Sequence, residues 1–310
     1  MNMNYIPVVF CFDRKYSQAA AVATYSLISN SQSPLRIYWI VPSNDYAGLS
    51  KFKTQIEEKI GHEILLRSAN ISIFQGWKTA NHFNESVYLR LLIPELVDEK
   101  KVIYLDSDTI VLGDLLDLFT LDINSYFLGG AVDDGAGAAS QIPLTNKDQY
   151  INSGVLLMNL DSLRENNFLS SLKKIQGQFF NEITWPDQCL LNKFADEKKL
   201  ILDSKWNLML SPNAIAASEF KKFITSEIKI IHFVGSIKPW QKWCNPEILN
   251  YWKRYAELAL SADLILEEIS NPEQAFSLAL SLDLNGAFND ASMLKSEIIT
   301  YLFRYIGQLK

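Results

Sequence analysis

The chain has 310 residues, of which 48% are hydrophobic and 21% charged, and its formal net charge is −6. This length can form one large α/β domain, and the composition is that of an ordinary soluble protein. The acidic balance argues against a nucleic-acid-binding surface. Cys11, Cys189 and Cys244 lie far apart, which predicts reduced thiols rather than disulfides or a zinc site. Since no segment has the length of a signal sequence or a transmembrane helix, we expect a cytoplasmic protein.

Apolar runs alternate with segments of helical spacing in the N-terminal part of the chain. The predicted order is strand, helix, strand, helix, strand, over Tyr5–Phe12, Gln18–Asn30, Leu35–Val41, Tyr46–Ile60 and Glu63–Leu66. This alternation is typical of a parallel, doubly wound sheet, in which ligands bind beyond the carboxyl ends of the strands. The loop that starts at Asp13 lies at such an end, but it contains no Gly-x-Gly-x-x-Gly or Walker motif.

Arg90 is a charged residue inside an otherwise mostly apolar stretch, Ser86–Leu92. One interpretation is that its aliphatic stem covers the edge of the core while the guanidinium reaches water. The other is that the cation serves a binding site. Taken alone, the residue favours the first interpretation.

Asp106 and Asp108 follow directly on the apolar run Val102–Leu105, and a second apolar run, Thr109–Leu112, comes after them. In an extended chain, side chains two residues apart lie on the same face. Two carboxylates at the end of a buried strand repel each other unless a cation joins them. The pattern therefore favours a divalent-metal site over the simple turn that an aspartate at a strand end often makes.

Two classes of enzyme have such a strand. Metal-dependent glycosyltransferases use Asp-x-Asp to hold a metal under a nucleotide-sugar diphosphate, whereas haloacid-dehalogenase-like phosphatases begin with Asp-x-Asp-x-Thr. Here Thr109 comes one residue early and Ile110 takes the place of the threonine, so the second match is partial. The acidic pair Asp114 and Asp117 also comes too soon to be the last phosphatase motif.

Polar residues again stand at the ends of apolar strands further along the chain. The predicted strand Phe127–Val132 leads into Asp133 and a Gly/Ala-rich loop, Gly135–Ser140, which is either filler or a lid. The predicted strand Tyr150–Leu160 opens with the polar Asn152. A polar residue at a strand start normally makes a turn, but these residues fall near the expected ligand-binding edge.

Asp187 opens a predicted helix, where an acid ordinarily serves as a cap or stabilises the first turn. His232 lies on an apolar strand, Ile228–Phe233, where a lone histidine is usually a satisfied core residue. Gly235 and Lys238 follow it, and they favour a different role. Glycine lets backbone amides approach a phosphate closely, and lysine adds a positive charge.

Beyond Trp252 only helices are predicted, because apolar residues recur there every three to four positions. The helices are expected over Ile248–Leu260, Pro272–Leu282 and Phe288–Leu309. The last one has an apolar stripe with few basic residues, formed by Leu294, Ile298, Leu302 and Ile306. The stripe predicts a packing helix, with weak peripheral contact to a membrane as the alternative.

Taken together, these motifs resemble glycosyltransferase family 8, the retaining nucleotide-sugar transferases, and above all its bacterial lipopolysaccharide galactosyl- and glucosyltransferases. The matching stretches are Cys11–Tyr16, Tyr88–Leu91, Leu105–Asp108, Tyr150–Leu157, Asp187-Gln188 and His232–Trp240. The combination of Asp-x-Asp with HFVGSIKPW makes the resemblance specific. It implies a glycosyltransferase-A-type α/β fold over residues 1–255, with a Rossmann-like nucleotide-binding half, and a helical C-terminal appendage over 256–310.

The resemblance implies that Asp106, Asp108 and His232 bind one Mn²⁺ under the diphosphate of a UDP-hexose. Two carboxylates and one imidazole suit Mn²⁺ better than Mg²⁺, which is the alternative. The metal would stabilise the charge on the departing nucleotide diphosphate. Lys238 and the backbone of Gly235 would bind the same phosphates.

The resemblance also assigns the remaining donor contacts. Asp13 would read the uracil edge, Tyr16 would stack on the base, and Lys15 would lie near it, where the galactosyltransferases are expected to have asparagine. Four residues would contact the donor-sugar hydroxyls, with the last of them selecting the hexose: Arg90, Asp133, Asn152 and Asp187.

Gln188 would lie below the anomeric carbon, beside Asp187. An amide is a poor nucleophile, so we expect attack on the same face through an oxocarbenium-like ion pair. The Gln188 carbonyl would stabilise the positive charge, and the leaving phosphate oxygen would take the proton of the acceptor.

These expectations describe a metal-dependent retaining transferase that moves galactose or glucose from UDP to a glycan acceptor. The product would be a bacterial surface polysaccharide, lipopolysaccharide or glycoprotein glycan. Variable loops, Phe74–Asn84 and Ala136–Thr145, would bind the acceptor. A self-glucosylating, glycogenin-like enzyme and a non-catalytic module that binds nucleotide sugar or glycan are the alternatives. The sequence sets neither the hexose, nor the linkage, nor the oligomeric state.

Overall fold

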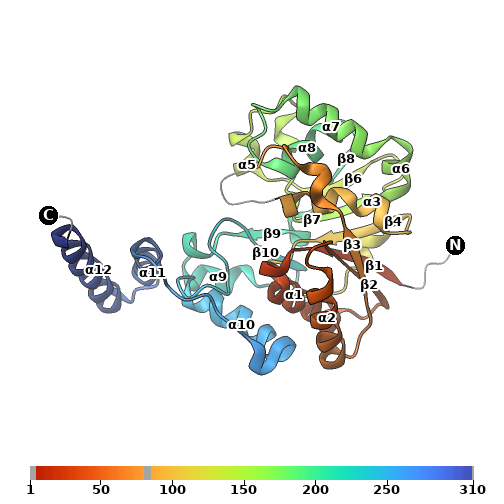
Figure 1. Ribbon diagram of the computed structural model, residues 1–310. Helices are drawn as coiled ribbons and strands as arrows, with labels where there is room; N and C mark the ends of the chain where they lie inside the picture. Colours follow the sequence, from red (N-terminus) through yellow and green to blue (C-terminus); the bar gives the residue numbers. More distant parts are fainter. Residues whose placement is uncertain (1–4, 80–84, 309–310) are drawn as a thin grey trace.

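The computed structural model describes residues 5–79 and 85–308 of the chain, which contain two sheets (Figure 1). The larger sheet has the strand order β3-β2-β1-β4-β7-β6-β8. Its strands are β1 Ile6–Cys11, β2 Leu35–Pro42, β3 Ile64–Ala69, β4 Lys101–Leu105, β6 Leu128–Ala131, β7 Val155–Asn159 and β8 Lys199–Leu202. The smaller sheet has the order β5-β10-β9, with β5 Thr109–Val111, β9 Leu208–Leu210 and β10 Ile230–Phe233.

Helices cover both faces of the larger sheet (Figure 1). One face packs against α1 Ser17–Asn30, α2 Tyr46–Ile60 and α10 Pro246–Leu260. The other packs against α3 Ile93–Leu96, α6 Leu160–Glu165, α7 Phe168–Gln178 and α8 Pro186–Phe194. The remaining helices are α4 Leu116–Thr120, α5 Asp134–Ala139, α9 Ala217–Phe223, α11 Pro272–Leu284 and α12 Phe288–Gln308. A hydrophobic core therefore lies on each side of the sheet.

The N-terminal strand–helix alternation follows the predicted order. The consecutive alanines Ala19, Ala20 and Ala21 are all buried, and their small side chains allow α1 to lie close to the sheet. Helix α2 ends at Gly61, whose φ of +65° is the left-handed conformation that glycine adopts without strain. Strands β1, β2, β3 and β4 are parallel, so their carboxyl ends lie on one edge.

Two expectations about this fold are wrong. The sheet is mixed rather than wholly parallel, because β7 runs antiparallel to both β4 and β6. The Gly/Ala-rich segment 135–140 is not a loop, since most of it belongs to helix α5. Asp133 caps that helix by accepting a hydrogen bond from the Ala136 amide at 2.9 Å.

The chain turns at the two acidic residues instead of running on as one strand. Strand β4 ends at Leu105 in the larger sheet, and β5 begins at Thr109 in the smaller one. Asp106 and Asp108 therefore lie where the two sheets meet. Their carboxylates come together through this turn and not through the alternation of an extended strand.

Helices α11 and α12 form a hairpin at one end of the molecule, away from the larger sheet (Figure 1). It is joined to the body by Asn213, which donates to Ser277 Oγ at 2.7 Å, and by Asn285, which accepts from the Ala217 amide at 2.6 Å. A helical C-terminal region is thus confirmed.

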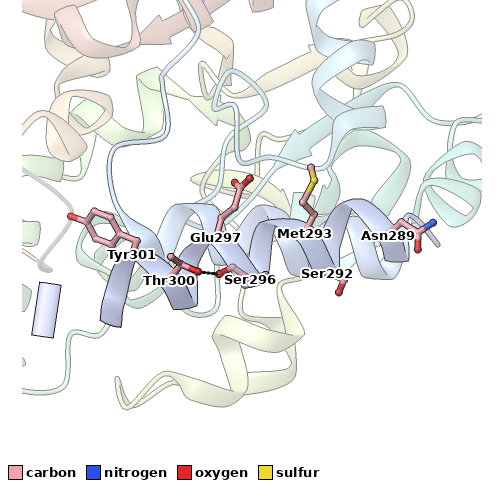
Figure 2. A pocket seen from close by; sticks show the side chains of 7 residues that line it. All are labelled: Asn289, Ser292, Met293, Ser296, Glu297, Thr300 and Tyr301. Atoms are coloured by element: carbon pink, nitrogen blue, oxygen red, sulfur yellow. Dashed lines mark hydrogen bonds between the residues drawn. The ribbon is translucent and has the colours of Figure 1, made fainter. Parts of the chain in front are cut away.

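One face of α12 borders a shallow pocket of about 670 Å³, lined by seven residues of that helix (Figure 2). Most are polar, and Met293 is 62% exposed. In the predicted apolar stripe, Leu294 and Ile298 are half-buried whereas Leu302 is exposed; the Ile306 side chain lies outside the described residues. Contact of α12 with a membrane stays a prediction. Among the helices described, none is both long enough and apolar enough to cross a membrane.

Candidate active site

The three residues expected to bind metal come together where the sheets meet. The ladder between β5 and β10 places His232 opposite Thr109, next to the turn that carries Asp106 and Asp108. The Phe233 amide extends this ladder by donating to the Asp108 carbonyl at 3.0 Å. One potential ligand atom from each of the two aspartates and His232 lies within 4.8 Å of the others. Residues far apart in the sequence thus form one cluster that could hold a cation.

Lys238 brings a positive charge into this cluster. Its ammonium group lies 2.5 Å from Asp108 Oδ2 and donates to the Phe233 carbonyl at 2.8 Å. Burial opposes ionisation of Asp108, but Lys238 and His232 outweigh it and hold the pKa of that carboxyl well below its ordinary value. Gly235, with a φ of +87°, lies in the turn between β10 and Lys238. The sequence predicts a phosphate contact for Lys238, whereas here the residue neutralises Asp108.

The donor set of this cluster fits a divalent cation such as Mn²⁺. His232 Nε2 lies 3.3 Å from Asp108 Oδ1 and 3.7 Å from Asp106 Oδ2, so one imidazole nitrogen faces both acids. Carboxylate oxygen together with imidazole nitrogen is a ligand set that divalent transition metals accept. The ring also packs closely on Gly154, where an added Cβ would lie 2.1 Å from His232 Cε1. The lack of a side chain at Gly154 therefore makes room for the ring in this position.

Arg90 links this cluster to a second one. It lies in the 3₁₀ helix Glu85–Leu92, and its guanidinium pairs with Asp106 Oδ1 at 2.8 Å and with Asp187 Oδ2 at 3.2 Å. The group also lies over the Tyr104 ring, 4.7 Å from its centroid. Burial disfavours the charge, but Asp106 and Asp187 outweigh it and raise the pKa of Arg90. The interpretation in which this guanidinium reaches water is wrong.

The residues expected to contact the donor sugar form the second cluster. Asp133 follows β6, Asn152 and Ser153 precede β7, and Asp187 and Gln188 lie in the first turn of α8. Asp133 Oδ2 accepts from Asn152 Nδ2 at 3.0 Å and from Gln188 Nε2 at 3.3 Å. Ser153 donates its hydroxyl to Asp187 Oδ2 at 2.9 Å and its amide to Gln188 Oε1 at 3.0 Å. A set of polar side chains therefore surrounds the start of β7.

Asp187 does not cap α8, since the N-cap residue is Trp185. It lies in the first turn and is buried, with Arg90 and Ser153 as partners. Burial raises the pKa of Asp187 even though Arg90 acts in the opposite direction. Arg90, the cation that holds the Asp187 carboxylate in place, also pairs with Asp106.

The residues expected to bind the base lie just beyond β1. Asp13 caps a short 3₁₀ helix by accepting from the Lys15 amide at 3.0 Å. The Tyr16 ring lies edge-on to Trp240, with centroids 5.6 Å apart, so the segment that carries Tyr16 touches the segment that carries Lys238. A pocket of about 310 Å³ lies beside them, and its lining includes Asp13, Lys15, Asp45 and Glu85.

The structure adds residues that the sequence analysis did not single out. Tyr104 donates its hydroxyl to Asp106, and Asn207 lies between His232 and Asn152, with Asn207 Oδ1 3.1 Å from His232 Nδ1. Asn207 belongs to no motif. Its one signal is a polar residue between Trp206 and Leu208 in an apolar stretch, which is too common to be informative.

Comparison with known proteins identifies the family to which this fold belongs. The sequence profile of the family described as Glycosyl transferase family 8 matches residues 7–244. Glycosyltransferase GlyF of Streptococcus pneumoniae serotype 4 is 30% identical over 62% of this chain and 48% of its own length. Lipopolysaccharide 1,2-glucosyltransferase of Escherichia coli K12 is 23% identical over 79% of this chain and 76% of its own length. The chain spans about half the length of the first pneumococcal relatives it matches.

Solved structures show the same architecture. Galactosyltransferase LgtC, in complex with donor and acceptor sugar analogues, has a TM-score of 0.70 at 23% identity, covering 82% of this chain and 95% of that one. Glycosyltransferase GlyE of Streptococcus pneumoniae TIGR4 has a TM-score of 0.60 at 25% identity, covering 82% and 60%. The expected glycosyltransferase-A-type fold is thus confirmed, and the chain belongs to glycosyltransferase family 8.

Proposed function

We propose that the chain transfers galactose or glucose from a UDP-sugar to a glycan acceptor with retention of the anomeric configuration. One observation carries the proposal. The Asp106–Asp108–His232 cluster is joined through Arg90 to a cluster of amides and carboxylates suited to sugar hydroxyls. Relatives named as a lipopolysaccharide glucosyltransferase and a galactosyltransferase support a hexose donor and a surface-glycan product.

In this proposal, Asp106, Asp108 and His232 hold one Mn²⁺, with Mg²⁺ as the less suited ion. When bound, the metal would act as a Lewis acid and offset the negative charge that develops on the departing UDP. Lys238 would turn one of its three N–H donors from Asp108 toward the diphosphate, and the Gly235 backbone would contact the same group. Both residues would bind phosphate without taking part in bond making.

The second cluster would bind the hexose. Asp133 and Asn152, which are hydrogen-bonded to each other, would form hydrogen bonds to hydroxyls of the donor sugar. Asp187 would select the hexose. Arg90 holds Asp187 and Asp106 in place, so we assign it a positioning role together with any contact to the sugar. Buried donors and acceptors of this kind discriminate strongly, because a wrong sugar leaves them unpaired.

Gln188 would lie below the anomeric carbon and stabilise positive charge there. Its Oε1 accepts from the Ser153 amide at 3.0 Å, and this bond fixes the direction of the carbonyl dipole. Because an amide is a weak nucleophile, we propose attack by the acceptor on the face that UDP leaves. The leaving phosphate oxygen would accept the proton of the acceptor hydroxyl.

The base and the acceptor complete the proposal. Asp13 and Tyr16 would bind uracil, with exposed Lys15 beside them. The acceptor would contact 136–145 and 74–84, of which residues 80–84 lie outside the described part of the chain. We place the catalytic domain at residues 1–255 and a helical appendage at 256–310, although helix α10 runs across that boundary.

The test is donor hydrolysis, followed as release of UDP from a panel of UDP-sugars with Mn²⁺. We expect slow release from UDP-galactose or UDP-glucose, and a loss of at least about 100-fold in Asp108→Asn, which removes one of the charged ligands. Asp114→Asn, which alters an aspartate outside the cluster, is the matched control and should retain activity.

Failure would take distinct forms. Tight binding of UDP and Mn²⁺ without release from any UDP-sugar, even when glycan acceptors are added, would favour a binding module. Hexose attached to the purified protein, detected by mass spectrometry, would favour self-glucosylation. No binding of UDP in the presence of Mn²⁺ would refute the proposed function, and a covalent sugar trapped on Asp187 or Gln188 would refute same-face attack.

A further inference from the structure

His232 is held on three sides by groups from different elements. Gly154 lies against its ring, and Asp106 and Asp108 face Nε2. On the remaining side Asn207 Oδ1 lies 3.1 Å from Nδ1. Asn207 is 1% exposed and immediately precedes β9, where the register pairs Met209 with His232. Side chains two residues apart along an extended chain share a face, so Asn207, two residues before Met209, lies on the face of His232.

The orientation of the Asn207 amide follows from groups whose roles are not ambiguous. The Gly154 backbone N–H can only donate, and it points to Asn152 Oδ1 at 2.9 Å. The Asp133 carboxylate accepts from Asn152 Nδ2 at 3.0 Å, which agrees with this orientation of Asn152. The Asn207 atom 3.0 Å from Asn152 Oδ1 must therefore be its donor, Nδ2.

The atom of Asn207 that faces His232 is consequently the carbonyl oxygen, which only accepts. Nδ1 of His232 must then carry a proton. In a neutral imidazole the other nitrogen, Nε2, has a free lone pair, and this is the nitrogen that faces the two aspartates. An unprotonated Nε2 beside two carboxylates is oriented to bind a cation.

We propose that Asn207 is a positioning residue that sets the tautomer and ring orientation of His232. Through Asn152 it also connects the proposed metal cluster, which contains His232, to the proposed sugar cluster, which contains Asn152. This inference rests on the metal site of the proposed function. A group that orients a metal-binding histidine typically contributes 10- to 100-fold to metal affinity. Through Asn152, binding of the donor sugar would be coupled to binding of the metal, because a sugar that moves Asn152 also acts on His232.

The first test reads the tautomer directly. The chain has three histidines, so protein labelled with ¹⁵N-histidine gives a simple spectrum, and His232→Gln identifies the signals of residue 232. Metal-free protein is studied at a pH high enough that a further increase no longer shifts these signals. We expect the proton of neutral His232 on Nδ1. A proton on Nε2 in the wild type would overturn the proposal, whatever the variants do.

The second test uses two substitutions of the same residue. Asn207→Ala removes the acceptor, so we expect a mixed tautomer and about 10- to 100-fold weaker Mn²⁺ binding in the presence of UDP, measured by electron paramagnetic resonance. Asn207→Asp keeps an acceptor for Nδ1–H but cannot donate to Asn152, so it should preserve the tautomer. Identical spectra and Mn²⁺ affinities for the wild type and Asn207→Ala would contradict the proposal.

Asn245→Ala is the matched control. Asn245 is equally buried and donates to the Ile215 carbonyl at 2.8 Å, so its loss should lower stability without changing the His232 spectrum or Mn²⁺ affinity. The same Mn²⁺ loss in both alanine variants would also overturn the proposal. If Asn207→Ala shifts the tautomer while Mn²⁺ binding does not depend on Asp108, the proposed function fails but the positioning of His232 by Asn207 is supported.

Discussion

The proposed metal cluster (Asp106, Asp108 and His232) and the proposed sugar cluster (Asp133, Asn152, Ser153, Asp187 and Gln188) shift the pKa of a buried aspartate in opposite directions. Asp108 and Asp187 are both buried, yet the pKa of Asp108 is lowered and that of Asp187 is raised. The difference lies in the cations. Asp108 has the Lys238 ammonium at 2.5 Å, whereas Asp187 shares Arg90 with Asp106. Burial alone therefore does not set the direction in which the pKa of a carboxyl shifts; whether the carboxyl shares its cation with another acid matters as well.

Removal of the shared cation is expected to have the largest effect. Arg90→Met leaves Asp106 and Asp187 without their guanidinium partner in a buried setting. The free energy of unfolding should fall by about 3–5 kcal/mol, the range for breaking a buried ion pair from one side. Urea denaturation measures it.

The control for Arg90 is Arg36→Met. Arg36 pairs with the buried Glu99, but the Arg36 side chain is 43% exposed and Glu99 also accepts from the Tyr38 hydroxyl at 2.9 Å. We expect a loss of about 1 kcal/mol or less. Equal losses at Arg36 and Arg90 would show that the shared cation is not the distinguishing feature of the two clusters.

A methyl group added at Gly154 tests the metal cluster separately. In Gly154→Ala the new Cβ would lie 2.1 Å from His232 Cε1 and 2.6 Å from Nδ1, so the ring or the backbone must shift. We expect a loss of about 1–3 kcal/mol in the free energy of unfolding. Binding of Mn²⁺ in the presence of UDP should weaken as well.

Gly177→Ala provides the comparison for this substitution. Gly177 lies in α7, and a Cβ there would meet no atom of the described residues within 4 Å. The substitution should leave Mn²⁺ binding unchanged and raise stability by up to about 1 kcal/mol, because alanine favours helix. A normal Mn²⁺ affinity in Gly154→Ala would mean that the position of the His232 ring does not matter for the metal.

The smallest expected effect is a difference in pH dependence. Burial raises the pKa of Asp187 above its ordinary 3.8. At pH values between these two pKa values, the native state therefore still binds a proton that the unfolded state has released. Wild-type stability relative to Asp187→Asn should therefore fall as the pH rises above about 3.8 through the native pKa. For Asp108 the sign is reversed, and stability relative to Asp108→Asn should be lost as the pH falls below about 3.8. Urea unfolding at several pH values measures both, and slopes of the same sign would refute the contrast.

The sequence predicted the local elements well where their period is visible. The bounds of α2 match because an amphipathic segment ends at Gly61. The bounds of β1 and β2 lie within one residue of the predicted ones, because continuous apolar runs of that length form buried strands. Strand direction was not predictable. An antiparallel strand buried on both faces, such as Val155–Asn159, has the same apolar run as a parallel one.

In the candidate site, too, the sequence predicted some features and not others. Asp106, Asp108, His232 and Lys238 could be named because they stand within a recognisable pattern. Their contacts could not be, since the pairing of Lys238 with Asp108 and of Arg90 with two acids depends on how distant segments pack. The helix α5 escaped prediction because glycine and alanine have little side chain to indicate burial.

By itself the sequence determined which residue types are available for chemistry and many of the segments that form helices and strands, because both depend on short-range patterns. Only the tertiary structure decided how those residues are charged, oriented and linked. Asn207 is the clearest case, because its effect on His232 arises from a strand register and from hydrogen bonds to Asn152. Hydrogen bonds and charge pairs act over a few ångströms in space, and separation along the chain does not indicate that proximity.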